Sequence, residues 1–182
     1  MLTGDEKREL LRVARNAVEC AVEGVPMTLP AESSAGLQSS GGAFVTLRLH
    51  HSLRGCIGYI LSELPLVESV ADAARKAAME DPRFRPLSRQ ELPEITLEVS
   101  VLSPPRRVAS PEDIIVGQDG LILEIGKRRG LLLPQVAEEY GWSREEFLEA
   151  VCEKAGVAAG SWRLHGAALS AFRAEVFHEE EM

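Results

Sequence analysis

The chain has 182 residues, of which 45% are hydrophobic, and a formal net charge of -8 at pH 7. The length and the hydrophobic fraction predict one domain or two interleaved lobes around an apolar core that needs no cofactor, metal or disulfide. The acidic balance argues against the extended basic surface of a nonspecific nucleic-acid binder, although it permits a small local anion site. The three cysteines are far apart without a CxxC pair, so we expect a cytoplasmic protein without disulfides or a zinc site. No stretch is long and apolar enough to cross a bilayer, so we expect no membrane span.

A helix and a long loop are predicted first. Between Asp5 and Val22 the apolar residues recur at helical spacing, and Gly24 and Pro26 end the pattern, which indicates an amphipathic helix. The following segment, Met27–Gly42, is rich in Ser, Gly, Ala and Pro and has neither helical nor strand periodicity. We expect a weakly ordered loop there, with no role assigned to it.

Two strands, a helix and a third strand come next. Ala43–Leu49 alternates between apolar residues and the rest, and Leu53–Ile60 is compatible with the same alternation, which predicts two neighbouring strands. Pro65 is suited to the first turn of a helix that continues to Met79, and the Asp81-Pro82 pair stops it. Ile95–Val101 alternates again, as expected of a strand with one buried face.

The last part of the chain mixes short helices and strands. We predict a capped turn at residues 110–113, a hairpin at 121–133 and a helix that begins at Pro134. A helix that begins with a capping box follows at 143–156, and a final strand at 172–177. Strands broken by helices without a regular strand–helix alternation favour an α+β fold over a doubly wound parallel sheet.

The first two strands carry a cluster of chemistry-bearing residues. If His50-His51-Ser52 forms the loop between them, Thr46 faces Cys56 and Arg48 faces Arg54. Like charges directly opposite each other in a sheet are unfavourable, so we expect a compensating anion beside the two arginines. It is either an acidic side chain, such as Glu98 or Glu175, or a bound carboxylate or phosphate.

Cys56 is the candidate catalytic residue. It lies two residues from Arg54, and nearby positive charge lowers the pKa of a thiol, so it is suited to act as a nucleophile or redox thiol. The alternative is a small core residue, because free cysteine is among the residue types most often buried. Gly55 and Gly58 indicate close packing or room for a ligand. The candidate binding residues are Arg48, Arg54, Gly55 and Gly58.

Five short motifs follow one another along most of the chain: Phe44-Val45-Thr46-Leu47, Leu53-Arg54-Gly55-Cys56-Ile57-Gly58, Asp81-Pro82-Arg83-Phe84, Leu133-Pro134-Gln135-Val136 and Lys154-Ala155-Gly156. In this order they resemble the successive signatures of the AMME chromosomal region candidate protein family, the AMMECR domain. The loop at residues 27–42 carries none of these motifs.

The resemblance implies a two-lobed α+β fold. The larger lobe, residues 1–104 plus 163–182, would hold an antiparallel sheet with flanking helices, and residues 105–162 would form a smaller α+β lobe. Prokaryotic relatives are grouped with Memo-like and radical-SAM proteins as protein A of a presumed AmmeMemoRadiSam system. The resemblance therefore implies partner proteins of these two kinds, but it implies no reaction.

Three functions are compatible with these observations. The favoured one is an accessory module that binds a partner protein or a small anionic ligand at the Leu53–Gly58 strand and the cleft between the lobes. The first alternative is a Cys56-dependent enzyme or redox thiol protein. The second alternative is a nucleic-acid-associated factor, which the acidic charge disfavours.

Overall fold

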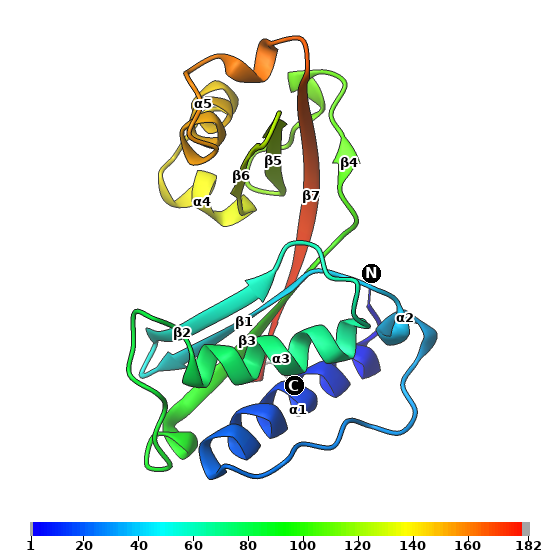
Figure 1. The fold of residues 1–182 in the computed structure, drawn as a ribbon, viewed down its shortest axis with the longest axis vertical. Coiled ribbons are helices and arrows are strands. Elements are labelled where there is room, and N and C mark those ends of the chain that lie inside the picture. Colours follow the sequence, from blue (N-terminus) through cyan, green and yellow to red (C-terminus); the bar gives the residue numbers. More distant parts are fainter. Residues whose placement is uncertain (1, 180–182) are drawn as a thin grey trace. The chain divides into compact units, whose positions relative to one another are not determined.

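The chain forms two compact units of mixed helix and strand. The computed structural model describes residues 2–179, so Met1 and residues 180–182, which end the predicted larger lobe, lie outside the described residues. The first unit holds the residues up to Leu102 and those from Glu175 onward, and the second unit is Ser103–Ala174. Strand β7 (Ala167–His178) runs through both units (Figure 1). The predicted two-lobed α+β fold is confirmed.

Two helices cover one face of the first unit's sheet. Helix α1 (Gly4–Glu23) begins with a capping box between Thr3 and Glu6 and ends at Gly24, which has a φ of 71°. Helix α3 (Leu66–Met79) starts after Pro65, and its alanines at 73, 74 and 77 are buried. Small side chains at these positions allow the two helices to pack side by side beneath the strands (Figure 1). Both helices confirm the predicted ones.

The first unit's sheet is antiparallel. It has the order β2-β1-β3, with β7 following β3, and its strands are β1 (Ala43–Leu49), β2 (Ser52–Tyr59) and β3 (Ile95–Leu102), the last preceded by the 3-10 turn η1 (Leu92–Glu94). Val45 and Leu47 on the central strand β1 are fully buried and belong to the core that α1 and α3 complete. Strand β2 is therefore an edge strand, and no strand within residues 2–179 pairs with its outer side.

The predicted pairing of β1 with β2 is correct along most of the hairpin and wrong at its turn end. Thr46 faces Cys56 and Leu47 faces Gly55 as expected, but Arg48 faces Leu53 instead of Arg54. The loop is a two-residue turn, His50-His51, with positive φ at both residues, and a bulge shifts the register beyond Leu47. A bulge places two residues of one strand opposite one residue of the other. The two arginines therefore do not oppose each other.

The long loop after α1 contains structure that the sequence did not predict. A short helix, α2 (Ala35–Gln38), is capped by Ser34, and Leu37 within it is fully buried. The Leu66 N–H donates to the Ser39 carbonyl at 2.9 Å. This part of the loop is tied to the start of α3.

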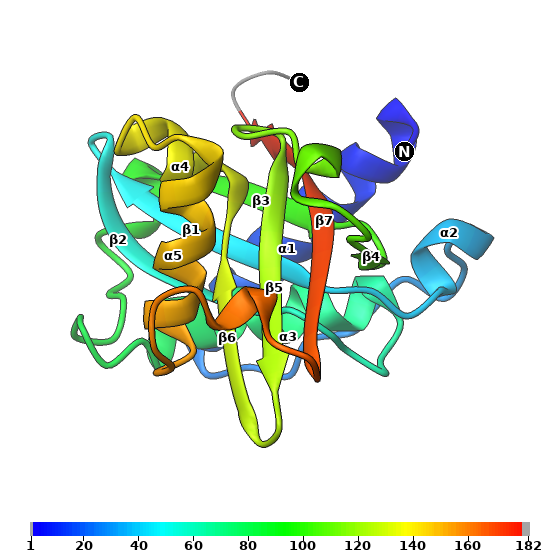
Figure 2. The same cartoon turned by 90° about the horizontal axis from the view of Figure 1, so that it is seen from above.

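The second unit is built on a sheet with the order β4-β7-β5-β6. Its elements are β4 (Arg106–Arg107), η2 (Pro111–Asp113), β5 (Asp119–Ile125), β6 (Arg128–Leu132), α4 (Pro134–Glu139), α5 (Arg144–Lys154) and η3 (Ser161–Arg163). Helix α5 runs beside β6 (Figure 2), and Leu121, Leu123, Phe147 and Val151 form the centre of the core. The predicted hairpin and both predicted helices are present. Within residues 2–179, none of the helices combines the length and hydropathy needed to span a bilayer.

Candidate functional site

The hexapeptide Leu53–Gly58 lies on the edge strand β2, where a second motif is bound to it. At Cys56 the backbone N–H donates to the Asp81 carboxylate at 2.9 Å, and the backbone carbonyl accepts from the Arg83 guanidinium at 3.3 Å. A carboxylate and a guanidinium thus occupy the outer side of β2 where a neighbouring strand would otherwise pair. The structure brings the Asp81–Phe84 motif to Cys56.

Asp81 is fixed by several charge-assisted hydrogen bonds. It is 3% exposed, and besides the Cys56 N–H it accepts from the Arg83 backbone at 3.1 Å and from the Arg83 side chain at 3.0 and 2.7 Å. The Arg83 guanidinium, followed by the backbone donors, holds the pKa of Asp81 well below its ordinary value despite the burial. Asp81 is therefore an anion that anchors this turn to β2.

Arg54 pairs with the carboxylate of Glu91, which is neither Glu98 nor Glu175. Its buried guanidinium donates to Glu91 at 2.8 and 3.3 Å and to the Pro86 carbonyl at 3.4 Å. This pairing lowers the pKa of Glu91 to about 2. Neither Glu98 nor Glu175, the acids named as examples for the arginine pair, contacts Arg54, and the acid that does so lies in the segment after α3.

Arg48 has the predicted partner Glu98, although the contact is long. The Arg48 Nε lies 3.6 Å from the Glu98 carboxylate, and its Nη1 donates to the His51 carbonyl at 3.4 Å. The side chain of Arg48 is 42% exposed. Glu175, the other predicted acid, instead pairs with Lys7 at 2.7 Å. An acidic side chain, one of the two alternatives drawn from the sequence, thus pairs closely with Arg54 and only at long range with Arg48.

The Cys56 side chain belongs to a line of polar residues on the sheet face turned away from α1 and α3. Thr46 on β1 lies opposite both Cys56 on β2 and Glu98 on β3. The Thr46 hydroxyl donates to the Cys56 sulfur at 3.3 Å, and His178 Nδ1 lies 3.6 Å from the Glu98 carboxylate. We call Cys56, Thr46, Glu98 and His178 the polar row.

The spacing of the polar row limits its chemistry. Neighbouring strands are about 4.8 Å apart, so His178 on the fourth strand is roughly 14 Å from Cys56 and cannot take its proton directly. Among the residues that the structure describes, no group of three His, Cys, Asp or Glu side chains could hold a metal ion. A row of separate donors and acceptors is suited to holding a ligand that has several polar groups.

The two glycines of the hexapeptide are explained by packing. A Cβ at Gly55 would collide with the Ala77 carbonyl of α3, and a Cβ at Gly58 would collide with the Phe44 ring and the Ala43 carbonyl. Both glycines therefore allow close approach within the first unit, which was one of the two interpretations of the sequence. The assignments of Arg48, Arg54, Gly55 and Gly58 to binding and of Cys56 to catalysis stay predictions.

Four residues of this site had no role assigned from the sequence: Asp81, Arg83, Glu91 and His178. Asp81 and Arg83 belong to a motif that the family resemblance contains, so their pattern was visible but their contact with Cys56 was not. Glu91 lies in the same segment but outside the five motifs, and its contact with Arg54 depends on the tertiary structure. The position of His178 in the polar row follows only from the pairing of the strands.

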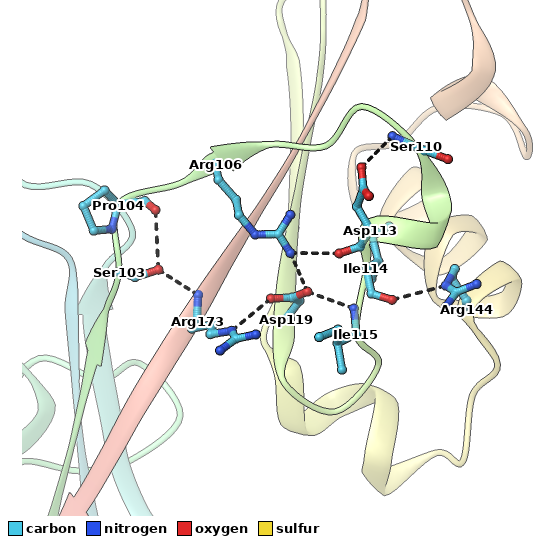
Figure 3. A network of polar contacts seen from close by, with 10 residues as sticks. All are labelled: Ser103, Pro104, Arg106, Ser110, Asp113, Ile114, Ile115, Asp119, Arg144 and Arg173. Atoms are coloured by element: carbon cyan, nitrogen blue, oxygen red, sulfur yellow. Dashed lines mark hydrogen bonds and ion pairs between the residues drawn. The ribbon is translucent and has the colours of Figure 1, made fainter. Parts of the chain in front are cut away.

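A second polar cluster lies in the second unit, around the fully buried Asp119 (Figure 3). One carboxylate oxygen accepts from the Arg106 guanidinium at 2.7 Å and from the Ile115 N–H at 2.8 Å. The other oxygen has no hydrogen bond within residues 2–179, and the Arg173 Nε is 3.5 Å away from it. Because Asp119 joins β4, β7 and the segment before β5, it is suited to a structural role.

Comparison with known proteins gives consistent results. The AMMECR1 family model matches residues 11–177. A protein of Methanothermobacter thermautotrophicus is 45% identical, with 98% of this chain and 97% of that protein covered. A protein of Thermococcus kodakarensis is 46% identical over 94% of this chain and 89% of its own length. The crystal structure of an uncharacterized protein from Pyrococcus horikoshii has a TM-score of 0.85 and 39% identity, covering 98% and 94% of the two chains.

Proposed function

The chain belongs to the AMMECR1 family, and from this premise we propose that it is an accessory module that binds a small anionic ligand at the polar row of the first unit. The ligand would carry a carboxylate or phosphate group. In this proposal Arg48 binds the negative charge, while the half-buried Cys56 thiol, which the buried Thr46 hydroxyl orients by a hydrogen bond, contacts the ligand's remaining polar atoms.

The incomplete pairing of Arg48 is the observation that carries this proposal. A distance of 3.6 Å to Glu98 is longer than a good hydrogen bond, and the guanidinium is partly exposed. Arginine presents five donors in a planar fork that fits carboxylates and phosphates. Among residues 2–179 Arg48 donates to one carbonyl, so it retains N–H groups for an anion.

A binding role fits the surroundings of Cys56 better than the alternative of a Cys56-dependent enzyme. The cation expected to activate the thiol, Arg54, is paired with Glu91. Within residues 2–179 no histidine forms a hydrogen bond with the sulfur, whose side-chain partner is the Thr46 hydroxyl. A nucleophilic thiol needs an adjacent base or a lowered pKa, and this geometry supplies no base.

Partner proteins are the second part of the proposal. The family resemblance points to Memo-like and radical-SAM proteins, and an accessory module is expected to act together with such partners. Copurification of the tagged full chain from its own cells tests this directly. Recovery of neither kind of protein would contradict it. A nucleic-acid role is not proposed, because the net charge of -8 opposes binding to phosphates.

Alkylation of native cysteines tests the ligand site. Iodoacetamide labelling with peptide mapping is followed in the presence of phosphate, citrate or acetate, with half-buried Cys20 as the internal reference. We expect phosphate or citrate to slow labelling of Cys56 severalfold without slowing that of Cys20. Arg48→Ala is expected to abolish this protection, whereas Arg12→Ala, an exposed arginine outside the site, is expected to preserve it.

The same experiment separates the alternatives. If no anion changes the labelling of Cys56, or if Arg48→Ala leaves the protection intact, the proposed site is wrong. If Cys56 reacts much faster than Cys20 and Arg83→Ala slows the reaction, the thiol is activated by charge and the enzyme alternative gains support.

A further inference from the structure

The hollow between α1, α3 and the segment that follows α1 is a second place where the first unit is suited to bind a ligand. It has a volume of about 510 Å³, within the range of small-molecule sites. Its walls are mainly apolar and include Ala17, Ala21, Met27, Leu29, Leu64 and Ala71. The hollow lies among the helices, whereas the polar row lies on the sheet face turned away from them.

Small side chains create this hollow. Ala17 and Ala21 are four residues apart on α1 and therefore lie on one face of the helix, and Ala71 approaches from α3. Leu64 on the rim is 45% exposed, and Val25, which also lines the hollow, is 48% exposed. A ligand with an apolar body would remove this surface from water, which is favourable in proportion to the area covered.

The charged residues of the hollow leave one negative charge without a partner. Arg75 donates to Asp72 at 3.1 Å and to Glu80 at 2.5 Å. Asp72 also pairs with Lys76 at 2.9 Å and accepts from the Tyr59 hydroxyl. Glu68, one turn before Asp72 on α3, takes part in no ion pair or side-chain hydrogen bond among residues 2–179, and it lines the hollow. The charge complement of such a site is a cation.

We propose that this hollow binds a small organic ammonium ion. The apolar body lies between α1 and α3 against the three alanines, and the ammonium group pairs with the Glu68 carboxylate. An apolar pocket with few polar groups fixes the orientation of a ligand through those groups. The site takes the class of aliphatic or aromatic primary amines, and it rejects carboxylates of the same size.

The segment that covers the hollow is suited to admit such a ligand. Residues 26–32 make no backbone–backbone hydrogen bond among the described residues, and Met27 and Leu29 anchor the segment by packing against the core. A second hollow, of about 470 Å³, lies along the same segment and is lined by Met27, Leu29 and residues of α1. A segment held by so few contacts can shift at low cost in free energy.

Cys20 provides a reporter because it lines the hollow. The probe is n-hexylammonium, with n-hexanoate and n-hexanol as analogues of equal length and different charge. We expect n-hexylammonium to slow the alkylation of Cys20 while leaving Cys56 unaffected, and n-hexanoate to have no effect. Affinity is measured by titration of the Cys20 labelling rate on the full chain.

Two variants test the assignment. Glu68→Gln is expected to weaken n-hexylammonium about fivefold and to leave n-hexanol unchanged, whereas Glu63→Gln, a nearby exposed glutamate that does not line the hollow, is expected to change neither. Ala21→Leu fills the hollow and is expected to abolish binding of the probe, with circular dichroism confirming that the variant folds.

Several outcomes would overturn the proposal. They are equal binding of n-hexanoate, equal affinity of the Glu68→Gln and wild-type chains, or failure of n-hexylammonium to protect Cys20. If Ala21→Leu does not fold, the comparison of Glu68→Gln with Glu63→Gln decides alone. The result is independent of anion binding at Arg48, because the reporter cysteine and the probe differ.

Discussion

The β1–β2 hairpin of the first unit and the β5–β6 hairpin of the second are built alike but differ in regularity. Each has antiparallel strands, a two-residue turn, and a helix packed against it, α3 in one case and α5 in the other. Strands β5 and β6 pair without a shift of register, whereas β1 and β2 shift between Leu47 and Arg48.

The turns of the two hairpins also differ in their backbone conformation. In the β5–β6 turn the residue with positive φ is Gly126, at 59°, whereas in the β1–β2 turn His50 and His51 have φ values of 49° and 67°. A Cβ makes this conformation unfavourable, so glycine is the usual solution. The histidine turn and the bulge lie on the β1–β2 hairpin, which carries Thr46 and Cys56 of the polar row and is bound on its outer side by Asp81 and Arg83. Strained backbone tends to occur at functional sites, so the positive φ values of His50 and His51 agree with our placing the proposed ligand site on this hairpin and not on the regular one.

The largest expected effect tests what the two hairpins share. Gly55→Ala would place a methyl group against the α3 carbonyl of Ala77, and Gly130→Ala would do the same against the backbone of α5 at Ala155. We expect each variant to lose about 3 kcal/mol in the free energy of unfolding, measured by urea denaturation. Gly24→Ala, which has open space but a φ of 71°, is the control and should lose only about 1 kcal/mol.

Removal of the edge carboxylate sharpens the difference between the hairpins. Asp81→Ala leaves the Cys56 N–H and the Arg83 guanidinium without their partner, and we expect a loss of 2 to about 3 kcal/mol in urea denaturation. The labelling of Cys56 should accelerate as well, because β2 loses its bonds on the outer side. Unchanged labelling would show that Asp81 does not restrain Cys56.

Acid titration of stability tests the ion pair between Arg54 and Glu91. The folded pKa of Glu91 is about 2 against an ordinary value of 4.5, so its contribution to stability is complete above the ordinary value and is lost as the pH falls toward the folded value. We expect a loss on the order of 2 kcal/mol in the free energy of unfolding across this window.

Glu91→Gln should flatten this pH dependence, while the exposed Glu63→Gln should not. Asp81 contributes with the same sign, because its pKa is also lowered in the folded chain. A Glu91→Gln chain with the pH profile of the wild type would contradict the Arg54–Glu91 pair.

The smallest expected effect exchanges the turn chemistry of the hairpins. His51→Gly relieves a positive φ and should raise the free energy of unfolding by about 0.5–1 kcal/mol. Gly126→His should lower it by a similar amount. His51 is the better choice than His50, because His50 pairs with Glu94 at 2.8 Å. If His51→Gly lowers the free energy of unfolding, the His51 imidazole makes a stabilising contact that outweighs the cost of the positive φ.

The sequence determined the longer helices, most of the strands and most of the apolar residues of the core. Helices α1, α3 and α5 were predicted from apolar spacing and capping residues, and strands β1, β2 and β3 from alternation. These signals are local, because a helix cap or a strand face depends on residues a few positions apart. The pairing of Thr46 with Cys56 was also predictable, since only one register buries the apolar residues of both strands.

The tertiary structure decided which charges meet. The bulge beside Arg48 changed the partner of Arg54 from an opposing arginine to Glu91, and no pattern in the sequence announces a bulge. Asp119 likewise pairs with Arg106 on β4 and with Arg173 on β7, which lies much later in the chain. Polar partners are set by side-chain positions across strands and turns, where a shift of one residue moves a side chain to the other face of the sheet. Local periodicity therefore predicts the fold, but the contacts of the candidate site require the folded chain.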